Sequence, residues 1–408
     1  METFMRHLAL ALAASTALVA PSAFAQTVQT AAPAAPDQEP AFENQTRAPQ
    51  PPADAEVSTE TVGDGLPNLW SLEFLPDGRM LVSAKQGDLY LLGPDGELGD
   101  PIPGVPEVDA RGQGGLLDVA LGPDFAETGT IYFSYAEPRE EGGNGTSVAR
   151  GRLETGDAGT PELRDVEVIF RQTPAYDGDK HFGSRLVFAP DETLYVTVGE
   201  RSDARIRDRA QDLSAGMGKI FRITPEGAPA DGNPFLDQSD AQPEIWSYGH
   251  RNLQSAALDG EGRLWTVEHG PKGGDELNRP EAGLNYGWPV ITYGVEYSGQ
   301  PVGEGRTEAE GMEQPVYYWD PVIGPSGMAF YDGDEIPEWQ GAFLVGGLVS
   351  QGVVVLHMED DRVEYEERLS LGARIRDVKV GPDGAVYAVT ETRGGGGSTI
   401  VRISGQAG

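Results

Sequence analysis

The sequence predicts an all-β protein, a six-bladed β-propeller of four-stranded antiparallel blades. A turn that contains Asp, usually as Pro-Asp-Gly, recurs six times, and each copy lies between short strands of aliphatic and aromatic residues. The chain also holds 55 Gly and 31 Pro, which suits many tight turns, and the repeated part shows no sustained helical periodicity. Two β-sandwiches would carry similar turns, but six copies in one continuous run favour the propeller.

The six turns are spaced as blades would be. Asp77 and Asp124 are 47 residues apart, and the widest interval, from Asp259 to Asp332, is 73 residues. These intervals match one four-stranded blade plus variable loops. We expect residues 58–61 to pair with the C-terminal strand 399–403, which would close the ring and remove its exposed edges. The aspartates of the six turns are Asp77, Asp124, Asp191, Asp259, Asp332 and Asp383.

The N-terminal part of the chain divides into two segments ahead of the repeats. Residues 1–25 have a weakly positive start, an apolar stretch and a final Ala-Phe-Ala, which is typical of a secretory signal peptide. This predicts a periplasmic or secreted protein with no membrane insertion. Residues 26–57 are rich in Pro and Ala, and we expect them to form a disordered tether. The propeller, which would carry any catalytic site, is then residues 58–408.

The composition excludes several classes of function. The chain has 30 Lys and Arg against 65 Asp and Glu, a formal net charge of −35. Such an acidic surface repels phosphate, so nucleic acid and anionic membranes are excluded as partners. The chain has no Cys, which rules out disulfides, thiolate metal sites and cysteine nucleophiles. With 38% hydrophobic residues, the chain can bury a sizeable core.

Polar residues in the longer loops are candidates for a site, because propellers place variable loops at one mouth of a central channel. His181 is followed nineteen residues later by Glu200, and a carboxylate bound to one ring nitrogen would orient the histidine as a base. A histidine near an acid is also common as a structural pair. Gln113 lies in a Gly-rich segment that suits close approach of a planar ligand or a plain turn.

Three further segments carry groups suited to an anion and a cation. Arg251 and Asn252 are adjacent donors that suit either a bound carboxylate or an inter-blade salt bridge. Arg374 and Arg376 are two residues apart, so on a strand they would face the same side. Residues 268–278 supply carboxylates, amides and backbone carbonyls, which Ca²⁺ prefers. Together these segments predict a small anionic ligand beside a Ca²⁺ loop.

The sequence resembles the soluble quinoprotein sugar dehydrogenases, the glucose/sorbosone dehydrogenase-like family of pyrroloquinoline quinone (PQQ) enzymes, over nearly all of residues 58–405. Each motif alone would be a weak signal, but several occur in the right order. The motifs are GQGGLL (112–117), HFGSRLVF (181–188), GHRN (249–252), EHGP (268–271) with Asp275 and Glu276, NYGWP (285–289), PSGM (325–328) and RIRD (374–377).

The resemblance implies a PQQ cofactor across the channel mouth, chelated to Ca²⁺, that oxidises the C1 hydroxyl of an aldose to the lactone. It implies that His181 is the general base, that Glu200 is its acid partner, and that an external acceptor then takes the electrons. Arg251 and Asn252 would stabilise the quinone oxygen. The other implied ligands are Gln113, Arg374 and Arg376 for PQQ, the carbonyls of Gly270 and Pro271 for its Ca²⁺, and Glu276, Tyr286 and Tyr297 for a second, structural Ca²⁺.

This chain departs from the family pattern at two places. The family commonly carries a lysine after the segment 345–348, where this chain has Val349, Ser350 and Gln351. Either cofactor binding is weaker, or Lys180 or an arginine supplies the missing charge. The acid partner is Glu200 rather than the Asp of some relatives, which moves the carboxylate by one methylene.

Two other functions remain open at this stage. A non-catalytic propeller that binds sugars or an envelope partner is favoured by the missing lysine, and tight stoichiometric PQQ binding would eliminate it. A Ca²⁺-dependent lactonase would turn over without a quinone and would need a metal-bound water, for which the carboxylates are poorly clustered.

Overall fold

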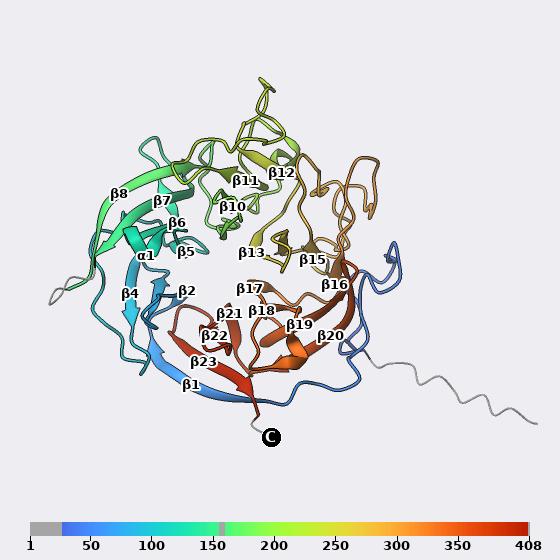
Figure 1. The fold of residues 1–408 in the computed structure, drawn as a ribbon. Coiled ribbons are helices and arrows are strands. Elements are labelled where there is room, and N and C mark those ends of the chain that lie inside the picture. Colours follow the sequence, from blue (N-terminus) through green and yellow to red (C-terminus); the bar gives the residue numbers. More distant parts are fainter. Residues whose placement is uncertain (1–26, 155–159, 407–408) are drawn as a thin grey trace, which may run out of the picture.

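The computed structural model describes residues 27–154 and 160–406, so the predicted signal peptide, 1–25, lies outside the described residues. Six antiparallel sheets form a ring, which confirms the six-bladed β-propeller (Figure 1). The helices within the described residues are short, and none is long and apolar enough to span a membrane. They are α1 (Phe125–Thr128) and the 3₁₀ turns η1 (Arg207–Gln211) and η2 (Pro337–Trp339).

The blades follow the chain in order, and we number them 1 to 6. Blade 1 contains β2 (Leu69–Phe74), β3 (Met80–Ala84) and β4 (Asp88–Leu92), and blade 2 contains β5 (Leu116–Leu121), β6 (Thr130–Pro138), β7 (Asn144–Glu154) and β8 (Glu162–Arg171). Blade 3 contains β9 (Leu186–Phe188), β10 (Leu194–Val198), β11 (Lys219–Ile223) and β12 (Ile245–Tyr248), and blade 4 contains β13 (Leu253–Leu258), β14 (Leu264–Glu268), β15 (Asp275–Asn278) and β16 (Tyr317–Trp319). Blade 5 contains β17 (Pro325–Phe330), β18 (Phe343–Gly347), β19 (Gly352–Glu359) and β20 (Arg362–Ser370), and blade 6 contains β21 (Arg374–Val380), β22 (Val386–Glu391), β23 (Ser398–Gly405) and β1 (Val57–Leu66).

The ring closes through the strand pair predicted from the sequence. β1 is antiparallel to β23, with Ser58 opposite Ser404 and Thr61 opposite Val401. Blade 1 differs from the prediction of four strands in every blade, because its fourth strand is reduced to isolated bridges such as Leu89 with Ile102. The prolines on either side of Ile102 lack the backbone N–H that a continuous ladder needs.

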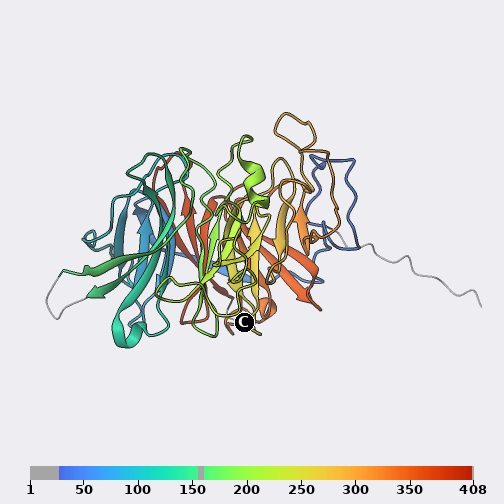
Figure 2. The same ribbon diagram turned by 90° about the horizontal axis from the view of Figure 1, so that it is seen from above.

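The six Asp-containing turns all join the innermost strand of a blade to its second strand. In the first turn the geometry is local: Asp77 Oδ1 accepts the backbone N–H of Arg79, and Gly78 takes a φ of 85°. Asp191, Asp259 and Asp383 accept the N–H two residues on in the same way. The turns therefore share one face of the ring, with α1 among them, and the loops that precede the innermost strands lie on the opposite face. Figure 2 shows these two faces edge-on. The innermost strands are β2, β5, β9, β13, β17 and β21.

Neighbouring blades pack through apolar clusters that lie between their sheets. Between blades 4 and 5, the rings of Trp265 and Phe343 lie 5.2 Å apart, and both side chains are about 1% exposed. A comparable cluster joins blades 1 and 2 around Phe133. Because the core is divided among these interfaces, each blade is held mainly by its two neighbours.

The prediction of a disordered tether over residues 26–57 is wrong for the described part of it. Residues 27–56, which we call the N-terminal strap, run along the outside of blades 4 and 5 (Figure 1, dark blue). Ala48 is fully buried and donates its N–H to the Tyr317 hydroxyl, while the carbonyls of Gln45 and Pro49 accept from Tyr318 and from blade 5. The strap is held by its backbone, and small Ala side chains permit this close approach.

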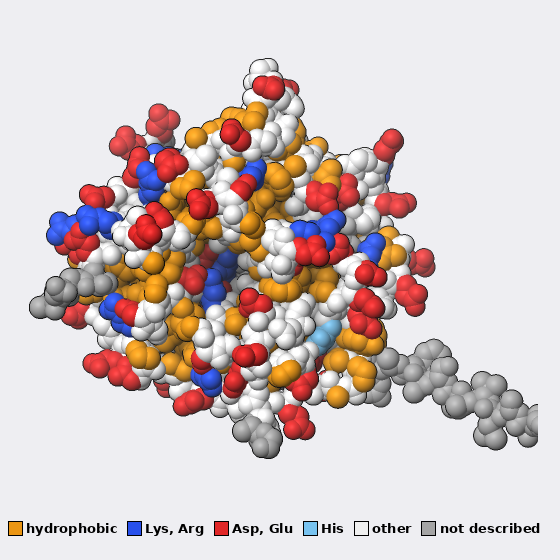
Figure 3. All heavy atoms as spheres, viewed as in Figure 1, with side chains coloured by type: hydrophobic (Ala, Val, Ile, Leu, Met, Phe, Trp, Pro, Cys, Tyr) orange, Lys and Arg blue, Asp and Glu red, His pale blue; other side chains and the backbone are white. Residues whose placement is uncertain are grey.

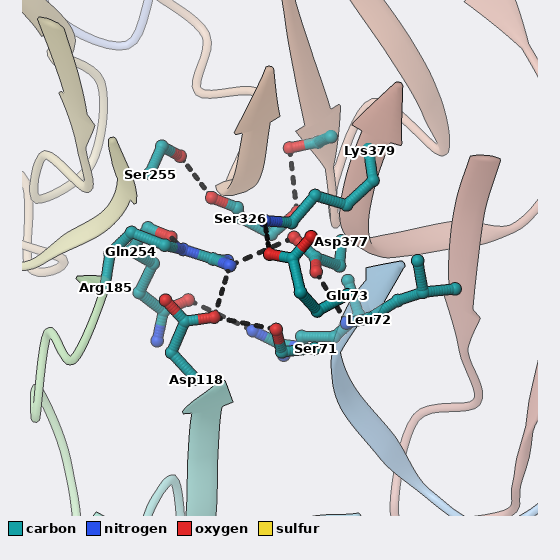
Figure 4. A network of polar contacts seen from close by, with 12 residues as sticks. Ser71, Leu72, Glu73, Asp118, Arg185, Gln254, Ser255, Ser326, Asp377 and Lys379 are labelled. Atoms are coloured by element: carbon teal, nitrogen blue, oxygen red, sulfur yellow. Dashed lines mark hydrogen bonds and ion pairs between the residues drawn. The ribbon is translucent and has the colours of Figure 1, made fainter. Parts of the chain in front are cut away.

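A network of charged side chains crosses the centre of the ring near the Asp-turn face (Figure 4). Arg185, 3% exposed, lies between Asp118 of blade 2 at 2.8 Å and Asp377 of blade 6 at 3.2 Å. Lys379 donates to Glu73 at 2.8 Å. Of these residues, Glu73, Arg185 and Lys379 line the cavity at the Asp-turn face, and Figure 3 shows Lys and Arg side chains in its central hollow.

Candidate active site

A cleft of about 440 Å³ opens at the centre of the face opposite the Asp turns. Its volume lies in the range of sites that hold a small molecule or cofactor. All six blades contribute to it, because each innermost strand begins at this face. The lining residues that carry the argument below are Lys85, Gln113, His181, Arg251, Asn252, Arg374, Arg376 and Glu391.

His181 and Glu200 form the buried pair that the sequence predicts. Nδ1 of His181 lies 2.6 Å from Oε1 of Glu200, and the two side chains are 8% and 2% exposed. Burial and the nearby Arg251 lower the pKa of His181 below its usual value, although Glu200 opposes this shift. The ring is therefore neutral at pH 7, and its Nδ1–H donates a hydrogen bond to the Glu200 carboxylate. The other nitrogen, Nε2, carries a lone pair and can take a proton.

Backbone constraints place His181 in this position. His181 has a φ of 49°, and its N–H donates to the side-chain carbonyl of Gln113 at 2.8 Å. The chain after β10 passes so close that a Cβ on Gly199 would lie 2.3 Å from the His181 carbonyl oxygen. Glycine at this position lets the Glu200 carboxylate reach the ring, and the Ser202 N–H fixes that carboxylate at 3.1 Å.

Arg251 and Asn252 enter the cleft from the loop between β12 and β13. The Arg251 guanidinium donates to the carbonyls of His269 at 2.9 Å and Gly270 at 2.6 Å, and it lies 5.0 Å above the Trp288 ring. Its Nε has no hydrogen-bond partner among the described residues, although the atom is buried. Asn252 accepts from the Gly183 N–H through its side-chain oxygen, which leaves its NH₂ group available to a ligand.

Arg374 and Arg376 face the cleft side by side, as their spacing predicts. Both donate to Glu391 on the neighbouring strand β22, and Arg376 also donates to the side-chain oxygen of Gln254 at 3.1 Å. Burial raises the pKa of Glu391, but the two arginines lower it by more, so the carboxylate stays charged. One carboxylate thus compensates only one of the two guanidinium charges.

The cleft is electropositive although the protein as a whole is acidic. Four Lys and Arg side chains line it against the single carboxylate of Glu391, while the whole chain carries −35. Three positive charges are therefore uncompensated in a partly enclosed space, where the field acts at low dielectric. A compact molecule with several negative charges is the ligand that this arrangement can hold.

The predicted metal residues separate into two places. Gly270, Glu276 and Tyr286 line a small cavity behind Arg251 and His269. Burial and the adjacent Glu268 raise the pKa of Glu276 well above its usual value. Within the part of the chain that the structure describes, the Glu276 carboxylate has only the distant Asn278 amide as a partner, at 3.5 Å. A cation would relieve this. The chemistry of the donors fits Ca²⁺, although no cluster of three or more His, Asp or Glu side chains occurs among the described residues.

Two of the predicted metal residues, Pro271 and Tyr297, do not line the small cavity. Tyr297 is 74% exposed and lines the main cleft instead, so the structure separates it from the second metal site implied by the resemblance. Pro271 packs against Gly294 outside both cavities. The loop that bears Tyr297 follows the one expected to bind metal in the sequence, but it turns toward the mouth of the cleft.

Sequence reasoning missed several residues of the cleft. Trp70 lies in β2 and Lys85 directly follows β3, while Gln254 is the second residue of β13 and Glu391 the last residue of β22. None of them belongs to an unusual loop, which was the signal used for the prediction. Position is a usable signal, because the start of the innermost strand and the end of the second strand lie at this face in every blade.

Comparison with known proteins assigns the family. A family model described as "Glucose / Sorbosone dehydrogenase" matches residues 66–402. The chain belongs to this family. It is 43% identical over 348 residues to the aldose sugar dehydrogenase YliI of Escherichia coli, a match that covers 84% of this chain and 92% of that protein. The resemblance seen in the sequence is thus confirmed.

Solved structures agree with this assignment. The soluble aldose sugar dehydrogenase of Escherichia coli in its apo form is 41% identical, with a TM-score of 0.81 over 86% of this chain and 100% of that chain. The PQQ-bound form of aldose sugar dehydrogenase from Streptomyces coelicolor is 28% identical, with a TM-score of 0.71 over 86% of this chain and 99% of that chain. This glucose/sorbosone dehydrogenase-family chain therefore shares the propeller of enzymes that act on sugars.

Proposed function

We propose that the protein is a PQQ-dependent dehydrogenase that oxidises the C1 hydroxyl of aldoses to the lactone and passes electrons to an external acceptor. The observation that carries the proposal is a cleft with three uncompensated positive charges, beside the buried pair of His181 and Glu200. A tricarboxylate cofactor fits the charges, and a neutral histidine fits the removal of a hydroxyl proton.

The cleft residues suit the cofactor by their chemistry. PQQ is a planar tricarboxylate whose quinone supplies a two-electron oxidation when bound. Arg374 and Arg376 would bind its carboxylates, and Gln113 and the free NH₂ of Asn252 would donate to its oxygens. The buried, unpartnered Nε of Arg251 supports a ligand acceptor at that point.

His181 carries the proton chemistry. Its Nε2 would take the proton of the C1 hydroxyl, and the two-electron oxidation supplied by a bound quinone would turn the C1–O bond into the lactone carbonyl. Glu200 holds the Nδ1 hydrogen and stabilises the imidazolium that forms. Arg251 supplies fixed positive charge where negative charge develops on the hydride acceptor, and the carbonyls of His269 and Gly270 keep the guanidinium in place.

Ca²⁺ is part of the proposal at two places. The carbonyl of Gly270 would contribute to the site of the cofactor's ion, and Glu276 with Tyr286 would hold a structural ion in the small cavity. Pro271 lies outside both cavities and is not part of this proposal. The unsatisfied carboxylate of Glu276 supports the second of these. We also propose export to the periplasm or the medium, on the basis of residues 1–25.

The test is a titration of the apoprotein with PQQ, with and without Ca²⁺, followed by a scan of aldoses with an artificial electron acceptor. We expect stoichiometric binding, an increase of affinity with Ca²⁺, and reduction of the acceptor. Binding of sugar without PQQ binding would instead support a non-catalytic propeller. Lactone hydrolysis without any quinone would support a Ca²⁺-dependent lactonase, and either result would overturn the proposal.

A further inference from the structure

Lys85 is a cleft residue for which neither the motifs nor the catalytic pair supplies a role. It follows β3 directly, and its backbone is fixed on two sides. Its N–H donates to the Asn68 carbonyl at 2.9 Å, and its carbonyl accepts from the Leu116 N–H at 3.2 Å. A Cβ on Gly115 would lie 2.0 Å from that carbonyl, so the contact between blades 1 and 2 requires glycine there.

The ammonium of Lys85 is placed but incompletely bound. Nζ donates to the Gly112 carbonyl at 2.5 Å, which is its one hydrogen-bond partner among the described residues. An ammonium has three donors, so two remain for a ligand. The side chain is half-buried and lines the same cleft as Arg376. Burial and the charge of Arg376 lower the pKa of Lys85. Glu391 and Asp179 oppose that shift.

Placing the Lys85 ammonium beside two arginines is electrostatically unfavourable unless an anion is bound in the cleft. A half-buried cation beside two arginines gains little from the single carboxylate of Glu391, which Arg374 and Arg376 already occupy. The carbonyl of Gly112 fixes the position of Nζ, so little side-chain entropy would be lost when a ligand binds.

We propose that Lys85 binds a carboxylate of the cofactor and supplies the third uncompensated positive charge of the cleft. This inference rests on the proposed function, because it assumes the PQQ tricarboxylate as the ligand. It also corrects an expectation from the sequence. Lys180 lies outside the cleft, is 56% exposed and faces Asp179 at 3.9 Å, so the structure does not give it this role.

The experiment compares PQQ affinities measured by equilibrium dialysis with Ca²⁺ present, which needs no turnover. In Lys85→Gln, we expect the Kd for PQQ to rise about 10- to 100-fold, the usual effect of losing one charge-assisted hydrogen bond. Lys85→Arg keeps the charge and should retain most of the affinity. Lys180→Gln is the matched control, since it removes one positive charge near the cleft and should leave the Kd within about twofold.

Ionic strength provides a second readout. The Kd of the wild type should rise more steeply with salt than that of Lys85→Gln, since one ionic contact has been removed. Equal Kd values and equal salt dependence for wild type and Lys85→Gln would overturn the inference, as would an equal loss in Lys180→Gln. If the wild type itself does not bind PQQ, the proposed function has failed instead, so the two failures are distinguishable. Thermal unfolding of each variant controls for loss of the fold.

Discussion

The two ends of the central channel use buried positive charge in opposite ways. At the Asp-turn end, Arg185 and Lys379 face three carboxylates, those of Asp118, Asp377 and Glu73, and every charge has a partner. At the cleft, four cations face the single carboxylate of Glu391. In the first arrangement every cation has a carboxylate of the protein as its partner, and the network holds four blades together. The second needs an external anion. Compensation, and not the number of arginines, therefore distinguishes the site from the scaffold.

Removing the proposed general base, His181, at the cleft end should have the largest effect of all the substitutions. In His181→Ala, we expect kcat to fall about 10²- to 10⁴-fold, because general-base catalysis is lost. PQQ affinity should change little, since the charges of the cleft remain. Steady-state kinetics and dialysis check the two parts. Unchanged turnover would show that another group removes the proton.

Removing a charge at the Asp-turn end should lower the stability of the protein more than its catalytic activity. In Arg185→Met, the carboxylates of Asp118 and Asp377 lose their buried partner, and the free energy of unfolding should fall by about 3–5 kcal/mol. Urea denaturation measures this. Arg79→Met is the control, because its ion pair with Asp77 is exposed and should contribute about 1 kcal/mol or less. Equal losses in the two variants would contradict the comparison.

The pH dependence sharpens the assignment of the catalytic pair. Neutral His181 is the active form, so kcat should rise with pH through a pKa below 6.5 and then reach a plateau. Because Glu200 raises the pKa of His181, Glu200→Gln should shift this rise to still lower pH, in addition to lowering the plateau. A rise displaced to higher pH would show that Glu200 does not interact with the charged imidazole.

The smallest effect on stability is expected for the ion pair of Lys379 and Glu73, which is partly exposed to solvent. Lys379 and Glu73 are 27% and 23% exposed, so water screens their interaction. In Lys379→Met, the free energy of unfolding should fall by about 1 kcal/mol or less, and kcat and PQQ affinity should not change. A loss as large as that of Arg185→Met would mean that the whole network acts as one unit.

The fold was predictable because its signals are local. In four of the six turns the aspartate accepts an N–H two residues on, a local interaction that the sequence pattern predicts. The order of the N-terminal strap was not predictable from its composition. Ala48 is held by a hydrogen bond of its backbone N–H, and backbone contacts of this kind leave no signal in the amino-acid composition. The prediction of a fourth strand in blade 1 was wrong, since the prolines around Ile102 interrupt the hydrogen-bond ladder.

The site was predictable where a side chain is unusual for its segment. His181 and Arg251 stand out in their loops, Arg374 and Arg376 stand out by their spacing on a strand, and the structure brings all four to one cleft. Lys85 does not stand out, because it follows an ordinary strand and only the ring geometry turns it toward the centre. Tyr297 shows the reverse error, since proximity in sequence to the metal loop does not imply a shared cavity.

The closure of the ring also constrains how the protein folds. β1 is synthesised before any other strand and its partner β23 after all of them, so more than 300 residues separate the two halves of blade 6. Until the last strand arrives, β1 remains an unpaired edge that can pair with other chains. Contacts between such distant residues form slowly. The order of synthesis thus makes the last blade the step at which folding and aggregation compete.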